Sequence, residues 1–436
     1  MKIEAINLKN YRAHQDLSVN FQPGFNLVVG LNGSGKTSLL KGICDALTGF
    51  ATYMSVPWGY SGLDEPDAPY LRTETVNGRF RFEPQFPVVV TATGDAAFGR
   101  GQWSVSKASQ IESGGIHGFA PDAVVEELQK MLGDDRRTSN TSVLPLIAFY
   151  RANRQWRGAV PSELQAATEK TSRNDAYANW ADASADSTAF QAWVIAKCLE
   201  RYQTSSETGL PFNHIVDDEL EFVSEALGEA VDGFLRMKYD LKQKSLIIDW
   251  EKDGTPIPVS FENLSDGQRA VICLVADIAR RMCLLNPVLG AEVIKKTPGV
   301  VLIDELDIHL HPRWQRILTT GLKRAFPSLQ FIAASHSPQV IGELQPEEII
   351  LLKQGETAHP QVSYGLSSSQ VLEEIMGAEA RSADVERRLG TLFDALGRND
   401  FEFARAELDS LKKDVPGIPE LAGAEALLRR KQVLGR

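Results

Sequence analysis

The sequence predicts an α/β fold in which a mainly parallel sheet is covered by helices. Three largely apolar runs, FNLVV at 25–29, VVLIDE at 300–305 and LQFIAAS at 329–335, are typical of strands buried on both faces of such a sheet. Helical apolar periodicity at 36–48 and at 312–326 follows the first two runs. Alternation of strands and helices favours a parallel sheet, because each helix leads the chain back to the same edge.

The N-terminal part of the chain is expected to form strands, one helix and a β-rich arm. The arm, residues 50–142, is rich in glycine, proline and aromatic residues and includes the strand-like pieces RFRFEP and FPVVVTAT. The expected elements are strands at 1–8, 17–21 and 25–29, a helix at 36–48, a short helix near 121–132, and a buried strand at the start of 143–156 that breaks into a polar segment.

The remainder is expected to be helical at first, then α/β, then helical again. Residues 160–235 show mainly helical patterns, and the strands MKYDL and SLIIDWE follow, closing with a turn at Asp253-Gly254. In the tail, 372–436, Ser382 and Pro419 are candidate helix starts. The other expected elements are helices at 271–285 and 312–326, buried strands at 300–305 and 329–335, and edge strands at 347–353 and 361–366.

The composition is that of an ordinary globular protein. With 43% hydrophobic and 24% charged residues, the 436-residue chain can form about two or three cores. A net charge of −11 argues against a general basic surface, so nucleic acid would need a local patch. The charged N-terminus and the lack of a long apolar run predict a cytoplasmic protein with no membrane partner.

A phosphate-binding loop follows the strand at 25–29. Residues 30–37, GLNGSGKT, fit the pattern G-x-x-x-x-G-K-[ST] and lie between a buried strand and a helix, which disfavours a chance match. Backbone N–H groups would surround the β-phosphate of ATP, next to the positive end of the helix. Lys36 would reach the β- and γ-phosphates and Thr37 would ligate Mg²⁺. The residues expected to bind ATP here are Asn32, Gly33, Ser34, Gly35, Lys36, Thr37 and Ser38.

Two carboxylates end the strand at 300–305. Alternation along a strand aims Asp304 and Glu305 in different directions. Asp304 would hold Mg²⁺, and Glu305 would face the γ-phosphate and polarise the attacking water, so that Glu305, Lys36 and His336 are the candidate catalytic residues. His336 ends the next buried strand, where it could bond the γ-phosphate or the water. The alternative is a set of solvent-exposed polar residues at two strand ends.

Asp307, His309 and His311, in ELDIHLHPRW, resemble metal ligands at first. Pro312 and Trp314 instead indicate a loop that opens a helix, and no further ligand lies nearby in sequence. We expect Asp307 to contact a neighbouring subunit at its nucleotide.

A second anion-binding turn, LSDGQ at 264–268, precedes the helix at 271–285. One phosphate loop leaves the γ-phosphate side of its nucleotide open. A second copy that presents Ser265, Gly267 and Gln268 would close that side and form two sites in a head-to-tail dimer with two-fold symmetry. ATP would then be part of the interface, and its γ-phosphate would govern dimer stability through linkage.

These motifs resemble the ABC-type ATPases of the SMC/RecF/OLD-like branch. The resemblance implies a P-loop NTPase of ABC-ATPase type with a mixed β/α nucleotide domain, a mainly helical insertion between the motif halves and a helical C-terminal tail. It also implies that Arg12, in LKNYRAHQDLSVNF, approaches the nucleotide and that Gln155 senses Mg²⁺ and the γ-phosphate; for Gln155 a simple polar loop is an open alternative. The expected divisions are 1–156, 157–235, 236–371 and 372–436.

Differences from some members of this branch narrow the set of families that the chain resembles. The chain has no sustained heptads and no Toprim-like tail, which separates it from SMC and OLD proteins. It looks most similar to the stand-alone PtuA-like ATPases of Septu and retron antiviral systems, which act with a separate nuclease. This implies an ATPase switch that controls an effector, such as an HNH-type nuclease. An ATP-stabilised scaffold and a RecF-like clamp on DNA or RNA stay open, and the tail could bind the partner or cover the ATPase core.

Overall fold

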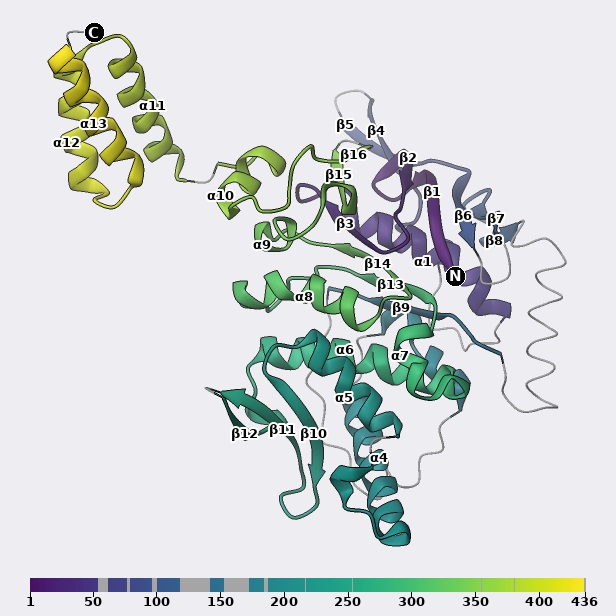
Figure 1. Ribbon diagram of the computed structural model, residues 1–436. Coiled ribbons are helices and arrows are strands. Elements are labelled where there is room, and N and C mark those ends of the chain that lie inside the picture. The colour runs from purple at the N-terminus through teal and green to yellow at the C-terminus, as the bar shows by residue number, and fades with distance from the viewer. Residues whose placement is uncertain are drawn as a thin grey trace. The chain divides into compact units, whose positions relative to one another are not determined.

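The computed structural model divides the chain into two compact units, Met1–Leu366 and Ser367–Arg436 (Figure 1). The predicted helix near 121–132 and the candidate Gln155 lie outside the residues that the structure describes. Those residues are 1–53, 62–76, 79–95, 100–117, 142–152, 172–183, 187–215, 217–252, 254–353, 355–379 and 381–434.

A six-stranded sheet forms the centre of the first unit, and five of its strands run parallel. Every residue of its four strands β3, β14, β13 and β9 is buried, which explains why they consist of continuous apolar runs. The α/β prediction is therefore confirmed. The strand order is β16 (Glu356–Ala358), β15 (Ile349–Lys353), β3 (Phe25–Val29), β14 (Leu329–Ala334), β13 (Gly299–Ile303) and β9 (Leu146–Tyr150).

Helix α1 (Lys36–Tyr53) packs between this sheet and a second, antiparallel sheet. In Figure 1, helices α5 (Glu219–Ala230), α6 (Asp266–Leu285) and α8 (Pro312–Ala325) lie on the side of the central sheet opposite β1 and β2. The second sheet has the order β2 (His14–Asn20), β1 (Lys2–Tyr11), β6 (Val88–Asp95), β7 (Arg100–Lys107) and β8 (Gly115–His117).

Buried amide side chains fasten these layers together. The Gln330 side chain accepts from Ile3 N at 2.7 Å and donates to Ile3 O at 2.8 Å, joining β14 to β1. Asn286, at the C-terminal end of α6, accepts from Leu144 N at 2.7 Å and donates to Leu144 O at 2.9 Å. Because a buried backbone group without a partner is costly, these side chains fix where the layers meet.

A three-stranded antiparallel sheet corrects the expectation of two strands before α6. Beyond the predicted strands β10 (Phe234–Asp240) and β11 (Ser245–Lys252), a third strand, β12 (Thr255–Ser260), follows the turn. Pro256 and Pro258 obscured it in the sequence. Proline is tolerated here because β12 is an edge strand, so a missing N–H can face away from the sheet.

The predictions for 347–353 and 361–366 are wrong in two respects. Strand β15 is not an edge strand, since it pairs with both β3 and β16. Residues 361–366 form no strand: the buried Ser363 hydroxyl donates to Leu344 O at 2.7 Å, and Gly365 has a φ of 82°. Val362 and Tyr364 are exposed, whereas Ser363 between them is buried, so the alternation of QVSYGL does not mark the buried face of a strand. Among the described helices, none is both long and apolar enough to cross a membrane.

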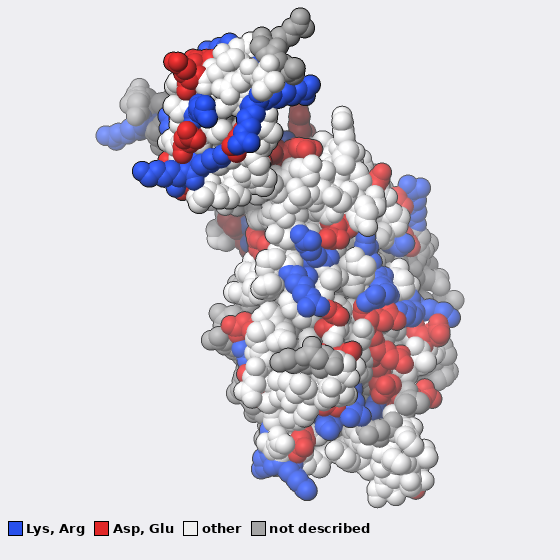
Figure 2. Space-filling view, turned by 60° about the vertical axis from the view of Figure 1, so that its left-hand side comes forward, with Lys and Arg blue, Asp and Glu red and all other residues white. Residues whose placement is uncertain are grey.

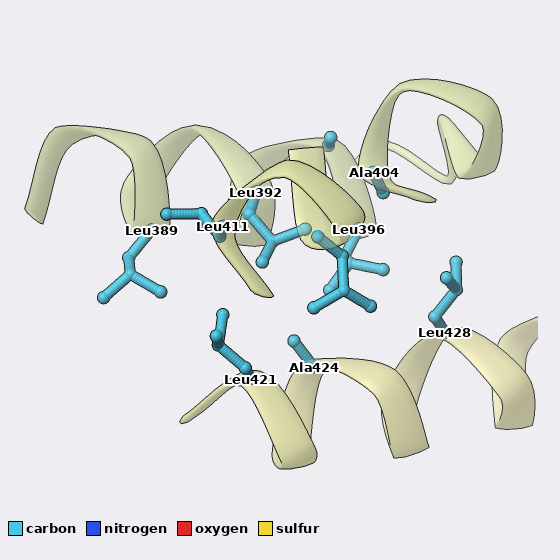
Figure 3. Packing of buried hydrophobic residues seen from close by; sticks show 10 residues of the cluster. Leu389, Leu392, Leu396, Ala404, Leu411, Leu421, Ala424 and Leu428 are labelled. Carbon is cyan, nitrogen blue, oxygen red and sulfur yellow. The ribbon is translucent and has the colours of Figure 1, made fainter. Parts of the chain in front are cut away.

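The second unit is a helical bundle with a core of its own (Figure 3). Its long helices are α11 (Ala383–Gly397), α12 (Phe401–Asp414) and α13 (Pro419–Leu434), so Ser382 and Pro419 do mark helix starts. A short helix, α10 (Ser368–Gln370), precedes them. Figure 3 shows leucines from all three long helices pointing into one apolar centre: Leu389, Leu392 and Leu396 of α11, Leu411 of α12, and Leu421 and Leu428 of α13.

Candidate nucleotide-binding site

The phosphate loop, Gly30–Thr37, connects β3 to the start of α1, as the sequence predicted. A Cβ at Gly30 would lie 2.5 Å from Ser34 Oγ and 2.6 Å from Leu352 O. Gly35 has a φ of 95°, and a Cβ there would lie 2.4 Å from the imidazole of the buried His14. These glycines therefore allow backbone packing that other residues would block.

Lys36 lies inside the curve of this loop. Its Nζ donates to Gly30 O at 3.1 Å and to Leu31 O at 3.3 Å, and the residue is 5% exposed. Burial lowers the pKa of Lys36, while the nearby carboxylates, first Glu305 and then Asp304, favour its charged form. A cation at this position can bind phosphate oxygens next to the N-terminus of α1.

Thr37 and Asp304 come together across the sheet edge. Thr37 Oγ1 donates to Asp304 Oδ2 at 2.9 Å, and Asp304 is 3% exposed. Asp304 directly follows β13, and its backbone N–H donates to Tyr150 O at 2.8 Å, which fixes the end of the strand. A hydroxyl and a carboxylate side by side are oxygen donors of the kind that Mg²⁺ binds. The two residues thus fit a magnesium site.

Glu305 and His336 form the next layer of the site. Glu305 Oε1 lies 3.8 Å from His336 Nε2, and both side chains are partly exposed. Burial raises the pKa of Glu305, while the charge of His336 opposes that shift. Glu305 also has a φ of 49°, a left-handed conformation that costs of order 1 kcal/mol in a residue other than glycine. Such strain is frequent at functional sites.

Asp307 binds within its own chain. Its Oδ1 accepts from Ser335 Oγ at 2.5 Å and from His336 N at 3.3 Å, so it holds the segment that presents His336. The expected contact of Asp307 with a neighbouring subunit stays a prediction. His311 caps α8, because its Nδ1 accepts from Arg313 N at 3.3 Å.

Arg12 lies beside the phosphate loop, but its side chain binds two acidic residues. Its guanidinium forms ion pairs with Glu65 and Asp67, and its side chain is 6% exposed. The following residues, Ala13 and His14, contact the phosphate loop at Gly35. The expected approach of Arg12 to the nucleotide stays a prediction, as does the role of Gln155.

The LSDGQ turn forms the N-terminus of α6. Ser265 is the N-cap: its Oγ accepts from Gln268 N at 3.3 Å, while the Gln268 side chain accepts from Ser265 N at 3.0 Å. A Cβ at Gly267 would lie 2.8 Å from His309 O, so this turn packs against the loop that follows Glu305. The predicted helix is present but begins at Asp266, five residues before the expected 271, so LSDGQ forms its cap and first turn; the binding of a phosphate by Ser265, Gly267 and Gln268 stays a prediction.

A buried polar cluster near the site was missed by the sequence analysis. Tyr150, at the end of β9, donates its hydroxyl to Asp277 Oδ2 at 2.8 Å. Asp277 lies on α6 and also accepts from Arg280 at 2.8 Å and from Arg281 at 2.7 Å. The signal was present in the sequence, since three charged residues interrupt the apolar run VICLVADIARRMCLL.

Two family models match the chain. One, described as an AAA domain, matches residues 5–244, more than half of the chain. The other, described as an AAA domain, putative AbiEii toxin, Type IV TA system, matches residues 157–342. The chain belongs to the AAA-domain ATPases. The predictions of an ATPase and of nucleotide binding are confirmed at the level of this family.

This AAA-domain ATPase has relatives in antiviral systems. The retron Ec83 probable ATPase of Escherichia coli is 35% identical over 190 residues, which are 42% of this chain and 34% of that protein. The Septu protein PtuA of Bacillus thuringiensis is 23% identical over 397 residues, 86% of this chain and 84% of that protein. A solved SMC head bound to the C-winged helix domain of ScpA aligns with 82% of this chain and 97% of its own, with 15% identity and a TM-score of 0.47.

The aligned part of the AAA-domain ATPase spans a minor part of several relatives. It covers 34% and 19% of the two retron ATPases and 15% of the Septu protein PtuA of Bacillus mycoides. The expected resemblance to PtuA-like and retron ATPases is confirmed.

The surface of the AAA-domain ATPase carries charges of both signs. On the face shown in Figure 2, basic and acidic side chains of the described residues are interspersed. This mixed pattern agrees with the net charge of −11 and differs from the single-sign stripe typical of a general nucleic-acid binder.

Proposed function

We propose that this AAA-domain ATPase binds ATP with Mg²⁺, forms a head-to-tail dimer around the nucleotide and uses hydrolysis to control a separate effector protein. The observation that supports it best is the presence in one chain of two helix starts whose glycine-bearing turns suit them to bind an anion. One, at Lys36, adjoins the carboxylates Asp304 and Glu305. The other, at Ser265, opens α6 and is exposed.

The first helix start would bind the triphosphate. The N–H groups of the phosphate loop and the Lys36 ammonium would bind the phosphate oxygens, and Thr37 and Asp304 would hold Mg²⁺. When bound, the ion neutralises charge on the β- and γ-phosphates. Glu305 would accept a proton from the attacking water, and its raised pKa makes its carboxylate a stronger base than an ordinary glutamate. His336, 3.8 Å from Glu305, would hold the γ-phosphate or the water.

The second helix start would serve the nucleotide of another copy. In such a dimer, Ser265 and the N–H groups of α6 would close the γ-phosphate side of a partner's ATP. Because neither subunit then holds a complete site, ATP stabilises the dimer by mass action and hydrolysis releases it.

The effector is proposed from the relatives. Proteins named as a retron probable ATPase and as Septu PtuA match this chain, which supports a role in antiviral defence. An HNH-type nuclease is the partner class that we expect. An ATP-stabilised scaffold with little turnover and a RecF-like clamp on DNA or RNA are the alternatives.

Ser265→Arg tests the dimer, and the chain offers a matched control. Ser367 and Gln370 form the same capping box, with 3.3 Å from Gln370 N to Ser367 Oγ and 3.0 Å from Ser367 N to the Gln370 side chain. Both arginine variants lose one cap, which costs about 1 kcal/mol of stability. We expect Ser265→Arg to bind nucleotide as a monomer but to lose ATP-dependent dimerisation and hydrolysis, and Ser367→Arg to keep both.

Light scattering with and without ATP, together with phosphate release, would measure these effects. A Ser265→Arg protein that pairs and hydrolyses ATP like Ser367→Arg would refute the shared site. A hydrolysis rate that is insensitive to DNA and RNA, with assembly still dependent on ATP, would favour the scaffold. Stimulation by DNA without any protein partner would favour the clamp.

A further inference from the structure

The buried cluster around Asp277 connects the two helix starts of the proposed site. Tyr150 links Asp304, which lies beside the first helix start, to the middle of α6, whose start is the second: its carbonyl oxygen accepts from Asp304 N at 2.8 Å, and its hydroxyl donates to Asp277 Oδ2 at 2.8 Å. Tyr150 is fully buried and Asp277 is 6% exposed. One residue therefore joins the magnesium-binding carboxylate to the helix that bears Ser265.

Asp277 lies about three turns along α6 from Ser265, roughly 18 Å by the rise of a helix. Two buried arginines also donate to its carboxylate: Arg280 to Oδ1, and Arg281 to Oδ2, the oxygen that Tyr150 also contacts; they are 8% and 4% exposed. Arg281 also donates to Ala176 O at 2.6 Å and to Ala178 O at 3.0 Å. The carboxylate is thus fixed in direction by three donors.

Packing two elements through a buried charged cluster costs desolvation free energy that an apolar contact does not cost. Burying an ion pair removes both charges from water, and apolar residues of the same volume often give equal or greater stability. What the cluster adds is a directional link, since a hydrogen bond weakens steeply as its angle departs from linear. The other end of α6 is held to the start of β9 by Asn286 and Leu144. Helix α6 is therefore fastened at two points, to the end of β9 and to the residue that lies just before its start.

We propose that Tyr150 and Asp277 are positioning residues that transmit the state of a subunit's own nucleotide site to its own LSDGQ turn. A shift at Asp304 on nucleotide binding moves the end of β9, and Tyr150 transfers that shift to α6, so that Ser265 is set correctly for the nucleotide of the partner copy. This inference rests on the proposed function, because the turn has a task only in a dimer.

Tyr150→Phe tests the link, since it removes the hydroxyl and keeps the ring. Tyr177→Phe is the matched control: Tyr177 is also fully buried, and its hydroxyl donates to Pro145 O at 2.7 Å rather than to α6. Both variants should lose one buried hydrogen bond and show similar decreases in melting temperature. Only Tyr150→Phe should uncouple the two sites.

Nucleotide affinity, dimerisation and kcat together distinguish a loss of positioning from a loss of folding stability. We expect nucleotide affinity of the Tyr150→Phe monomer close to that of the parent, and ATP-dependent dimer affinity lower by roughly 5- to 150-fold, the usual span of a coupling free energy. The kcat at saturating ATP should fall in parallel, because fewer complete sites form. Asp277→Asn keeps an acceptor for the Tyr150 hydroxyl, so it should retain more of this coupling than Tyr150→Phe even though it unfolds more easily.

Two outcomes overturn different statements. If the parent dimerises and hydrolyses ATP while Tyr150→Phe matches Tyr177→Phe in kcat and dimerisation, the link is wrong and the proposed function stands. If the parent itself does not dimerise with ATP, the proposed function is wrong and the link loses its purpose.

Discussion

Thr37 Oγ1 and Asp304 Oδ2 lie 2.9 Å apart, although 267 positions separate the two residues in the chain. The contact forms because β3, which leads to Thr37, and β13, which leads to Asp304, run parallel on either side of β14 and end at the same edge of the sheet. The phosphate loop and the carboxylates Asp304 and Glu305 therefore lie together at this edge of the sheet.

Thr37→Val should remove the dependence of nucleotide affinity on Mg²⁺. Valine has the shape of threonine but no oxygen, so Asp304 would lose its hydroxyl partner and the ion one ligand. We expect the ratio of ATP affinities in Mg²⁺ and in EDTA to fall toward one. Isothermal titration would measure it.

Thr319→Val is the control for this variant. Thr319 is fully buried, and within the described part of the chain its hydroxyl has no hydrogen-bond partner. Its replacement should leave the Mg²⁺ effect unchanged and stability equal or higher. A Thr37→Val protein with the parent's Mg²⁺ dependence would exclude Thr37 as a ligand.

Glu305→Gln should cut hydrolysis by about 10²–10⁴-fold, because it removes the base while keeping the size of the side chain. The raised pKa of Glu305 adds a pH effect. The base form accumulates as pH rises through that pKa, so the acid limb of the parent's kcat/KM, which reports the free protein, should lie above the ordinary glutamate range. Phosphate release across pH would show this limb in the parent.

Glu292→Gln is a suitable control, since Glu292 is 59% exposed and pairs only at the surface with Lys296 at 3.4 Å. It should keep the parent's rate and pH profile. Equal rates for Glu305→Gln and the parent would show that another group activates the water.

The sequence was sufficient for the parts of the site whose chemistry is local. The glycine loop before Lys36 and the apolar strand before Asp304 each predict a strand end from a few adjacent residues, and the parallel sheet then brings them together. The sequence was insufficient for contacts between residues that are distant in the chain. Nothing near Gly35 in sequence indicates that His14 fills the space beside it, and Tyr150 and Asp277 belong to separate elements.

The errors in the fold have a similar origin. Pro256 and Pro258 argue against a strand in general, and only the edge position of β12 makes them acceptable. The alternating pattern of QVSYGL does not follow burial, since Val362 and Tyr364 are exposed and the loop buries Ser363, whose hydroxyl bonds Leu344 O. In both cases tertiary position overrode the local signal.

Gly267→Ala should destabilise the protein by about 1–3 kcal/mol and weaken hydrolysis, because the new methyl group would lie 2.8 Å from His309 O. The obstacle is backbone rather than a flexible side chain, and His309 has a φ of 63°, which limits its adjustment. Urea unfolding and phosphate release would measure both effects.

Gly228→Ala separates this clash from the general effect of replacing a helical glycine. Gly228 lies within α5, and a Cβ there would meet nothing within 4 Å. Alanine should therefore stabilise this helix by up to about 1 kcal/mol. If Gly267→Ala is as stable as Gly228→Ala, the packing of the LSDGQ turn against His309 is not tight.

Asp277→Asn should lower stability most above pH 4, and the loss should shrink in acid. The arginines beside Asp277, first Arg281 and then Arg280, oppose the effect of burial and lower its pKa from 3.8 to about 2. A carboxylate with a depressed pKa stabilises the fold above its unfolded pKa and loses that effect as pH falls through its folded pKa. This shift corresponds to about 2 kcal/mol. Removing the charge also leaves two buried arginines without a counter-ion, so the total loss of stability is about 3–5 kcal/mol.

The difference in free energy of unfolding between parent and variant isolates Asp277, because asparagine does not titrate and all other carboxylates are common to both proteins. Urea unfolding of both proteins at several pH values between 7 and 3 should show that difference constant down to about pH 4 and then decreasing; a difference that stays constant in acid would mean that Asp277 keeps its proton affinity on folding.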